Sequence, residues 1–388
     1  MPISETWLLP DGVADVLPEQ AQVIERLRRQ ALDFLAQRGY HLIYTPFIEY
    51  LESLSSLSAL NQDLDLATFK IIDQISGRLL GVRADMTPQV ARVDAHVRPL
   101  QGVARYCYAG TVLHTKPQGL TASRAPLQLG AELFGHEGLD ADLEMIDTML
   151  GTLAIAGYQD QLHLDLGHVG LFRSLIKLAG LNATQEADLS DLYQRKALPE
   201  LKEYTQNLNL GADFYELGRS AGDVKLLLTT LSQTVLANQG FKQALESLQT
   251  AVEQVQARWP QVSVGVDVVE LRSYHYHTGL MFAVYAPNKA MPLAQGGRYD
   301  GIGEHFGRVR PATGFSCDLY RLVAEQFEAI ELIVAPAGRD EALLSAIAAQ
   351  RAQAKHVVQL LGDDQLDSVA DATHQLVQTD QGWQVQSL

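Results

Sequence analysis

The chain has 388 residues, of which 47% are hydrophobic and 20% are charged, as in an ordinary globular protein with one large domain and a smaller one. Acidic residues outnumber basic ones 46 to 30, for a net charge of −16, so nucleic acid is a poor candidate partner because phosphate contacts need a concentrated basic surface. No apolar run of about 18 residues and no signal pattern occurs, which argues against a membrane or secretory fate and favours the cytoplasm. Cys107 and Cys317 lack disulfide or metal-ligand spacing, and we expect both in the core.

The first part of the sequence predicts helices mixed with short strands. A helix is expected from Pro18 to Arg38, because apolar residues recur on one face and Gly39 follows as a stop. We then expect a strand, a helix or loop, and a hairpin, over residues 40–46, 47–60 and 64–83. Thr87 and Pro88 predict a new helix, with Thr87 as its N-cap and Pro88 at the first helical position.

The middle of the chain predicts two strands, a helix, a further strand and a long helical segment. These elements span residues 103–112, 126–134, 139–156, 161–166 and 169–258. In the second strand the alternation of side chains places Gln128, Gly130 and Glu132 on one face. An amide and a carboxylate therefore lie side by side on the predicted sheet.

The last part predicts three more strands, a helix and a small separate unit. The strands and the helix span residues 264–269, 280–285, 312–317 and 318–328. The small unit reads as a strand, a helix and a second strand, which form one βαβ crossover, over residues 332–335, 339–354 and 356–361. Strands that look antiparallel, together with segregated helices, predict an α+β fold with a body over residues 1–328 and a small α/β domain over residues 329–388.

Polar rings gather between two of these strands, in the segment Tyr274–His277. A core strand has no use for so many polar side chains, so we expect the wall of a ligand pocket there. His275 and His277 could instead chelate a metal ion with His305, but no carboxylate or cysteine has a supporting spacing, and hydrogen bonding is the favoured interpretation. The glycine-rich segment GGRYDGIG lacks the spacing of a phosphate-binding loop and predicts a tight turn.

Asp85, Gln128 and Glu132 form a second group of candidate ligand residues. A carboxylate on a buried sheet face is costly unless it meets a cation or several donors, and two of them beside polar aromatics suit a ligand with an amino group. The alternative is that Asp85 and Thr87 only begin a helix and that Glu132 pairs with a structural arginine.

Several ordered segments make the chain resemble class II histidyl-tRNA synthetases, from the first helix to about Leu322. Its first helix and strand, FLAQRGYHLIYTPFIEY, resemble the dimer-forming first motif. Four further segments are similar to the family's R-P-E-x-T, Q-L-G-x-E, G-G-R-Y-D and third motifs, namely Arg83–Thr87, Gln128–Glu132, Gly296–Asp300 and Gly314–Leu322 with Arg321 kept. The segment Ser273–Thr278 falls at the D-Y-Y histidine loop. The resemblance implies a class II aminoacyl-tRNA synthetase-like antiparallel sheet flanked by helices.

Two departures from the synthetase pattern bear on activity. Adenylation needs a cation on the α-phosphate of ATP, and the family's F-R-x-E-R-P motif supplies an arginine where this chain has Leu113, with Thr115 in place of the glutamate. The second catalytic arginine corresponds to Glu270, with Arg272 displaced by two residues. The C-terminal unit of about 58 residues, with three basic and eight acidic residues, also suits an anticodon poorly.

This combination is similar to the regulatory subunits of ATP phosphoribosyltransferase, a family related to the synthetases. The resemblance implies a non-catalytic chain that activates a short-form catalytic subunit in the first step of histidine biosynthesis and contributes to feedback inhibition. It further implies histidine as an allosteric ligand, no cofactor, no metal, a dimer through the first motif, and a larger hetero-oligomer.

The resemblance also implies which residues hold histidine. Asp85 would take the amino group with Thr87 and Glu132 beside it, Gln128 would reach the carboxylate end, and Tyr274 with His275 would contact the imidazole. Three alternatives remain open: an active histidyl-tRNA synthetase, another amino-acid-adenylating ligase, and a binding module without an effector role.

Overall fold

The computed structural model describes residues 8–55, 62–117, 119, 122–220, 222, 224–269, 276–287, 289–323 and 331–388. The chain divides into two compact units. One contains most of the residues up to Val323, and the other contains Ala324–Leu388 together with Val16–Val23.

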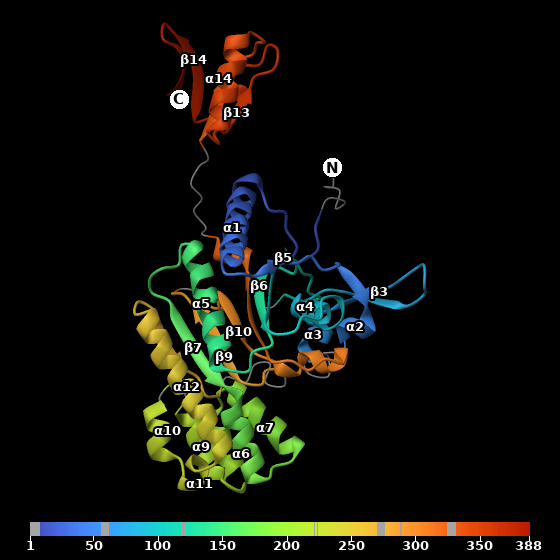
Figure 1. Cartoon of the computed structure of the whole chain (residues 1–388), viewed down its shortest axis with the longest axis vertical. Helices are drawn as coiled ribbons and strands as arrows, with labels where there is room; N and C mark the ends of the chain where they lie inside the picture. Colours follow the sequence, from blue (N-terminus) through green and yellow to red (C-terminus); the bar gives the residue numbers. More distant parts are fainter. Residues whose placement is uncertain are drawn as a thin grey trace, which may run out of the picture. The chain divides into compact units, whose positions relative to one another are not determined.

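The larger unit is built on an eight-stranded sheet, and Figure 1 labels five of its strands, β5, β6, β7, β9 and β10. In spatial order the strands are β1 (His41–Leu42), β5 (Ala104–Thr111), β6 (Leu127–Phe134), β11 (Ala312–Asp318), β10 (Ala294–Arg298), β9 (Leu280–Tyr285), β7 (His163–His168) and β8 (Ser263–Val266). Neighbours from β5 to β7 are antiparallel, which confirms the predicted fold class. The two edge strands pair in parallel, β1 with β5 and β8 with β7, because a long crossover precedes each pairing.

Helices cover both faces of this sheet. On one face lie α1 (Pro18–Gln37), α5 (Leu139–Ile155) and α12 (Gln239–Arg258). The other face carries α4 (Thr87–Arg92), a π-helical turn (Val93–Val97) and the 3-10 helix η3 (Asp300–Phe306). The buried residues of α1 recur with helical spacing, as the sequence predicts.

The helical segment after β7 confirms the prediction for residues 169–258. It contains α6 (Val169–Ala179), α7 (Ala183–Gln194), α8 (Leu198–Thr205), α9 (Gly211–Arg219), α10 (Val224–Thr230), α11 (Gln233–Leu236) and α12. Local signals define its helix ends: Asn182 and Gln185 form a capping box at the start of α7, and Gly180 adopts a left-handed conformation at the end of α6.

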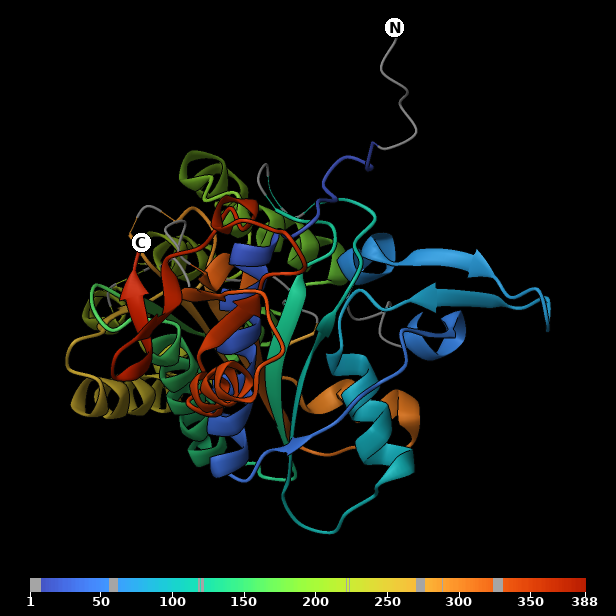
Figure 2. The same ribbon diagram turned by 90° about the horizontal axis from the view of Figure 1, so that it is seen from above.

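A small three-stranded sheet extends from the body, and Figure 2 shows its projecting hairpin. It consists of β2 (Ile48–Tyr50), β4 (Leu79–Val82) and β3 (Phe69–Ile72), accompanied by α2 (Leu51–Ser55) and α3 (Gln62–Ala67). The predicted hairpin is present, with Gly77 at a positive φ of 71°. The prediction was wrong in extent, because the first strand is only two residues long, residues 47–60 include β2, and helix α3 precedes β3.

The smaller unit has a four-stranded sheet in the order β13-β12-β14-β15. Its elements are β12 (Leu332–Ala335), α14 (Glu341–Ala352), β13 (His356–Gln359), the 3-10 turn Leu366–Ser368, β14 (His374–Thr379) and β15 (Gly382–Ser387). The predicted crossover is confirmed, since β12 and β13 pair in parallel. The β14–β15 hairpin went unpredicted because glutamines interrupt its apolar alternation.

Two further predictions can be compared with the described residues. The GGRYDGIG segment is not a tight turn, because its first residues belong to strand β10 and its last to η3. The last helix of the body, α13 (Leu319–Leu322), is shorter than predicted, and residues 324–330 lie outside the described part. Both cysteines are buried as expected, and burial raises the pKa of the Cys107 thiol to about 12. In the part of the chain that the structure describes, no helix is long and apolar enough to span a bilayer.

Candidate functional site

Four of the six predicted ligand residues come together on one face of the large sheet. Asp85 and Thr87 lie where β4 leads into α4, and Gln128 and Glu132 lie on β6. The other two, Tyr274 and His275, lie outside the described residues, as does Glu270.

Asp85 is the centre of a network that joins the start of α4 to β6. Its Oδ1 accepts hydrogen bonds from the Thr87 backbone N–H at 2.9 Å, the Thr87 hydroxyl at 3.0 Å and Gln128 Nε2 at 3.0 Å. Gln128 Oε1 in turn accepts from the Met86 N–H at 3.0 Å. Among the described residues, none donates a hydrogen bond to Asp85 Oδ2, which leaves that oxygen available to a ligand.

The prediction that Thr87 is the N-cap of α4 was wrong. Met86 occupies the cap position without a side-chain hydrogen bond, and Thr87 is the first helical residue. Its N–H is satisfied by the Asp85 carboxylate two residues earlier, a local bond that acidic residues favour in turns. Asp85 therefore orients the start of the helix, and Thr87 is free to present its hydroxyl to the sheet.

Glu132 is 2% exposed and is surrounded by hydroxyl groups. The Thr87 hydroxyl lies 3.0 Å and the Tyr108 hydroxyl 2.9 Å from Oε1, while the Tyr299 hydroxyl donates to Oε2. The single proton of the Thr87 hydroxyl can serve only one of Asp85 and Glu132 at a time. The sequence also allowed a structural arginine as the partner of Glu132. Among the described residues its partners are hydroxyl groups, and no arginine binds it.

Burial determines the protonation of this group. Desolvation is the largest effect and raises the pKa of Glu132 to about 8. The hydrogen bonds from Tyr299 and Tyr108 lower this pKa, whereas the charge of Asp85 raises it further. The same desolvation, and then the Glu132 charge, raise the pKa of Tyr108 and Tyr299 well above the usual value. The tyrosines therefore keep their hydroxyl protons, and Glu132 is mostly protonated at neutral pH without a ligand.

Three tyrosines belong to this group although none is among the six predicted ligand residues; only Tyr276 falls in the segment predicted to form a pocket wall. Tyr276 stacks on Tyr299, with ring centroids 5.2 Å apart and an interplanar angle of 20°. Tyr108 lies on β5 opposite Gly130 of β6, so it shares a face with Glu132. Tyr108 could not be predicted as a site residue without knowing that β5 pairs with β6. The alternation of side chains tells which residues of a strand share a face, but not which strand lies next to it.

Two glycines make room for these side chains. A Cβ built on Gly314 of β11 would collide with Glu132 Oε2, and one built on Gly130 would collide with the Tyr108 hydroxyl. Each therefore allows close approach of a buried polar group rather than a special backbone conformation. The G of Q-L-G-x-E and the first glycine of the third motif consequently have a steric role in this site.

The metal interpretation of the histidine pair gains no support. His275 and the His305 side chain lie outside the described part, and His277 packs edge-on against Tyr276 with centroids 5.2 Å apart. Within the described ranges no cluster of three histidine, cysteine or acidic residues could hold an ion. Arg298 of the glycine-rich segment is structural, because it binds Asp142 at 3.0 Å and the carbonyl oxygens of His136 and Gly138.

The position of the missing synthetase arginine is well defined. Leu113 follows β5, and its N–H donates to the Arg83 carbonyl at 3.0 Å. Its side chain carries no charge at the position where the resemblance to synthetases implies an arginine. Arg83 does not replace that cation, because its guanidinium donates to the carbonyl oxygens of Thr111 and Thr45, each at 2.9 Å. Arg321 is held by Asp318 at 3.7 Å.

Comparison with family models gives two matches in chain order. Residues 12–322 match the model described as histidyl-tRNA synthetase, and residues 331–386 match the C-terminal domain of ATP phosphoribosyltransferase subunit HisZ.

Similar proteins extend over the whole chain. A protein of Acinetobacter baumannii (strain AYE) named ATP phosphoribosyltransferase regulatory subunit is 69% identical over 388 residues and covers 100% of both chains. A crystal structure from Bacillus halodurans, described as an ATP phosphoribosyltransferase regulatory subunit/histidyl-tRNA synthetase, is 27% identical with a TM-score of 0.78 and covers 94% of this chain and 95% of that one. The ATP phosphoribosyl transferase (HisG:HisZ) complex of Thermotoga maritima contains a chain of the same fold, 19% identical with a TM-score of 0.58, covering 76% of this chain and 97% of that one.

Proposed function

This chain belongs to the family of ATP phosphoribosyltransferase regulatory subunits, and we propose that it senses free histidine through the network around Asp85 and Glu132. In this role it is not catalytic by itself. It activates a short-form catalytic subunit, which transfers a phosphoribosyl group to ATP, and it passes on inhibition by histidine, the end product of that pathway.

The single observation that carries this proposal is the pair of carboxylates held by neutral donors. Glu132 has three hydroxyl partners and Asp85 has a hydroxyl, an amide and a backbone N–H, with no basic side chain bound to either in the described ranges. Two buried or half-buried acids without a cation favour a ligand that brings positive charge and N–H donors. Histidine offers an ammonium group for Asp85 and an imidazole N–H within the same molecule.

The remaining contacts suit the same ligand. Gln128, fixed through its amide to Asp85 and to the Met86 N–H, lies beside the carboxylate group of such a ligand. The stacked pair Tyr276–Tyr299 presents aromatic faces to an imidazole ring. In this proposal Tyr274 and His275, outside the described residues, complete the imidazole side.

The same network does not support amino-acid adenylation. A synthetase must offset negative charge on the α-phosphate of ATP, and removing such an electrostatic group costs catalysis on the order of 10²–10³. Leu113 cannot supply that charge, and the sequence places Glu270 at the second arginine position. The ligand can therefore be bound without being activated, which suits a sensor.

Regulation requires that histidine bind two states of an assembly with different affinity, typically by about 1–3 kcal/mol. We propose a cytoplasmic hetero-oligomer in which this chain dimerises through its first motif and contacts the catalytic subunit. No cofactor is needed, because the chain contributes binding rather than chemistry. The acidic C-terminal unit, with three basic and eight acidic residues, belongs to this assembly rather than to tRNA recognition.

Reconstitution with a short-form catalytic subunit from the same organism tests the proposal. Formation of phosphoribosyl-ATP should rise when this chain is added and fall again when histidine is added. An unchanged rate in both steps would refute the regulatory role. Histidine-dependent exchange of pyrophosphate into ATP, assayed in parallel with this chain alone, would instead establish a synthetase, and we expect none.

A further inference from the structure

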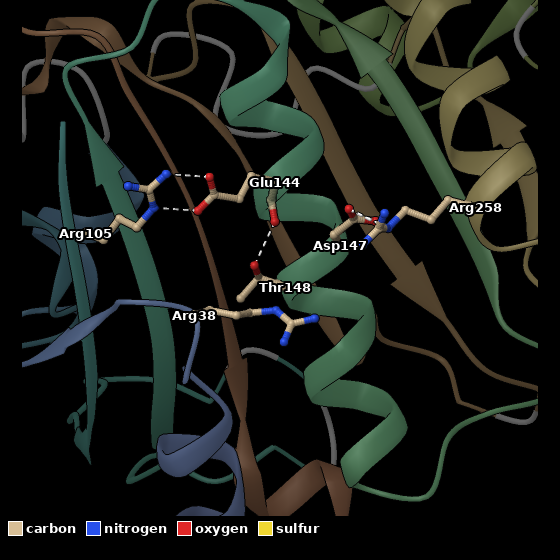
Figure 3. Close-up of a pocket in the computed structure, with 6 residues that line it drawn as sticks. All are labelled: Arg38, Arg105, Glu144, Asp147, Thr148 and Arg258. Carbon is tan, nitrogen blue, oxygen red and sulfur yellow. Dashed lines mark hydrogen bonds and ion pairs between the residues drawn. The ribbon is translucent and has the colours of Figure 1, made fainter. Parts of the chain in front are cut away.

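A second group of charged side chains lines a pocket of about 280 Å³ on the opposite face of the large sheet (Figure 3). It is lined by Arg38, Arg105, Glu144, Asp147, Thr148 and Arg258. The three arginines come from different elements, since Arg38 follows α1, Arg105 lies on β5 and Arg258 ends α12. Such convergence is notable in a chain of net charge −16.

The alternation of β5 separates this pocket from the network around Glu132. Tyr106 and Tyr108 point toward the α4 face, where Tyr108 binds Glu132. Arg105 precedes Tyr106 on the strand, so its side chain points to the opposite face, toward α5, where it binds Glu144. The pocket is therefore a different site, with the thickness of the sheet between the two.

Both carboxylates in the pocket are already neutralised by partners within it. Arg105 holds Glu144 through two parallel hydrogen bonds of 2.6 and 2.7 Å, and the Tyr40 hydroxyl adds a third at 2.9 Å. These bonds, led by the one from Arg105, lower the pKa of Glu144, so it stays ionised and bound. Asp147 takes a bond of 2.7 Å from Arg258 Nε.

Asp147 has a second partner, since the Trp259 indole N–H lies 2.7 Å from Oδ1. Arg105 uses only Nε and Nη2 for its carboxylate, and Arg258 uses only Nε. Each guanidinium has five N–H donors, so both keep donors that point elsewhere. The ion pairs thus hold the two cations in place without using up their capacity.

Arg38 is the one pocket arginine without an ion pair among the described residues, although its charge also helps to lower the pKa of Glu144. Its guanidinium lies 3.8 Å from the centre of the Phe34 ring, and it makes no hydrogen bond or ion pair with the described residues. Figure 3 shows it reaching across the outer face of α5 below the Glu144 and Asp147 pairs. The Phe34 ring that supports it packs against Gly151 of α5, where a Cβ would collide with it. The contact with the Phe34 ring, which itself packs on α5, therefore holds the Arg38 guanidinium at the pocket.

We propose that this pocket binds the phosphate group of a small phosphorylated molecule. Two ion pairs and one guanidinium without an ion pair leave the pocket with a single net positive charge and N–H donors from three elements, which matches a tetrahedral oxyanion better than a flat carboxylate. A volume of about 280 Å³ is several times the ~30 Å³ share of one liquid water, so the site admits more than the phosphate itself.

Calorimetric titration of the full-length chain with inorganic phosphate tests this site, with acetate at matched ionic strength as the carboxylate probe. Arg38→Gln removes the pocket charge that has no ion pair, at an exposed position just after α1. Arg26→Gln makes the same change at an exposed position on α1, outside the pocket. We expect saturable phosphate binding by the wild type and Arg26→Gln, roughly tenfold or greater weakening in Arg38→Gln, and no comparable acetate binding.

A thermal-shift series provides a second readout. Phosphate stabilises most proteins by exclusion from their surface, so only the difference between the two variants counts. Arg38→Gln should lose part of the phosphate-dependent rise in Tm that Arg26→Gln retains. The proposal is overturned if the wild type shows no saturable phosphate binding, if Arg38→Gln binds like the wild type, or if acetate binds equally well.

Discussion

Proton release on histidine binding is the most direct consequence of the Glu132 environment. Glu132 has a pKa raised to about 8 because it is buried, and it is therefore protonated in most molecules at pH 7. A ligand that places an N–H donor or a positive charge against the carboxylate favours its ionised form and lowers that pKa. Binding of histidine should then expel the proton from Glu132.

The size of the effect follows from the pKa. About nine-tenths of the carboxyl groups carry a proton at pH 7 and about half at pH 8, so binding should release about 0.9 and 0.5 proton from this group. Ionising the group at pH 7 costs about 1.4 kcal/mol, which corresponds to one pKa unit. Histidine affinity should consequently improve roughly tenfold as the pH rises from 7 to well above 8, apart from the titration of the ligand itself.

Calorimetry in buffers with different ionisation enthalpies measures the proton count. Glu132→Gln is the matched variant, because it keeps the shape of the side chain and removes its titration. The imidazole and the ammonium of histidine contribute equally to both proteins, so the difference between them isolates Glu132. A difference near zero at pH 7, with both proteins binding histidine, would refute the assignment of a protonated Glu132 in the ligand site.

Three further predictions follow from particular contacts. Asp85→Ala should abolish histidine binding by calorimetry while leaving assembly with the catalytic subunit intact, and unchanged affinity would contradict the role of this residue. Gly314→Ala should also lose histidine binding, because its Cβ collides with Glu132, and normal binding would show that the carboxylate can move. Arg310→Met should destabilise the fold by about 1–3 kcal/mol in urea unfolding, since it removes the guanidinium 2.8 Å from the buried Asp94 and leaves Arg308, 3.7 Å away, as its remaining cation. A loss under 1 kcal/mol would mean that Asp94 finds another partner or takes up a proton.

Much of the central sheet could be predicted because its elements have strong local signals. The strand β6 alternates regularly, α1 has one apolar face, and Asn182 with Gln185 defines a helix start within four residues. The predictions of helices and strands fail mainly where the hydrophobic pattern is short or is interrupted by polar residues. Strand β15 carries glutamines at alternate positions, and its pairing with β14 rather than its composition stabilises it.

The ligand site was only partly predictable for a different reason. Asp85 and Glu132 stand out because acids in apolar strands need an explanation, whereas Tyr108 and Tyr299 look like ordinary core aromatics. The Tyr108 hydroxyl reaches Glu132 because β5 pairs with β6. Tyr299, directly after β10, comes near because its N–H binds Ala312 of β11, the other neighbour of β6. No short segment encodes these non-local pairings. The role of Thr87 was likewise misjudged, since a threonine before proline is typical of an N-cap. Only the geometry shows that Thr87 is the first helical residue and that the Asp85 carboxylate accepts from its N–H.

The contrast between the two halves of the site explains how one body can bind an amino acid without activating it. In our proposal, recognition of the amino acid depends on two acceptors, Asp85 in the turn before α4 and Glu132 on β6, of which Glu132 is supported by buried hydroxyls. Activation depends on cations at the ends of strands, where a replacement such as Leu113 disturbs no buried hydrogen bond, because only the backbone N–H of that residue is engaged. Loss of the cations therefore costs little stability, while loss of either acceptor breaks a network that holds α4 to β6. A chain of this fold can lose adenylation by a few substitutions and still keep its ligand network, which is the change that a histidine sensor requires.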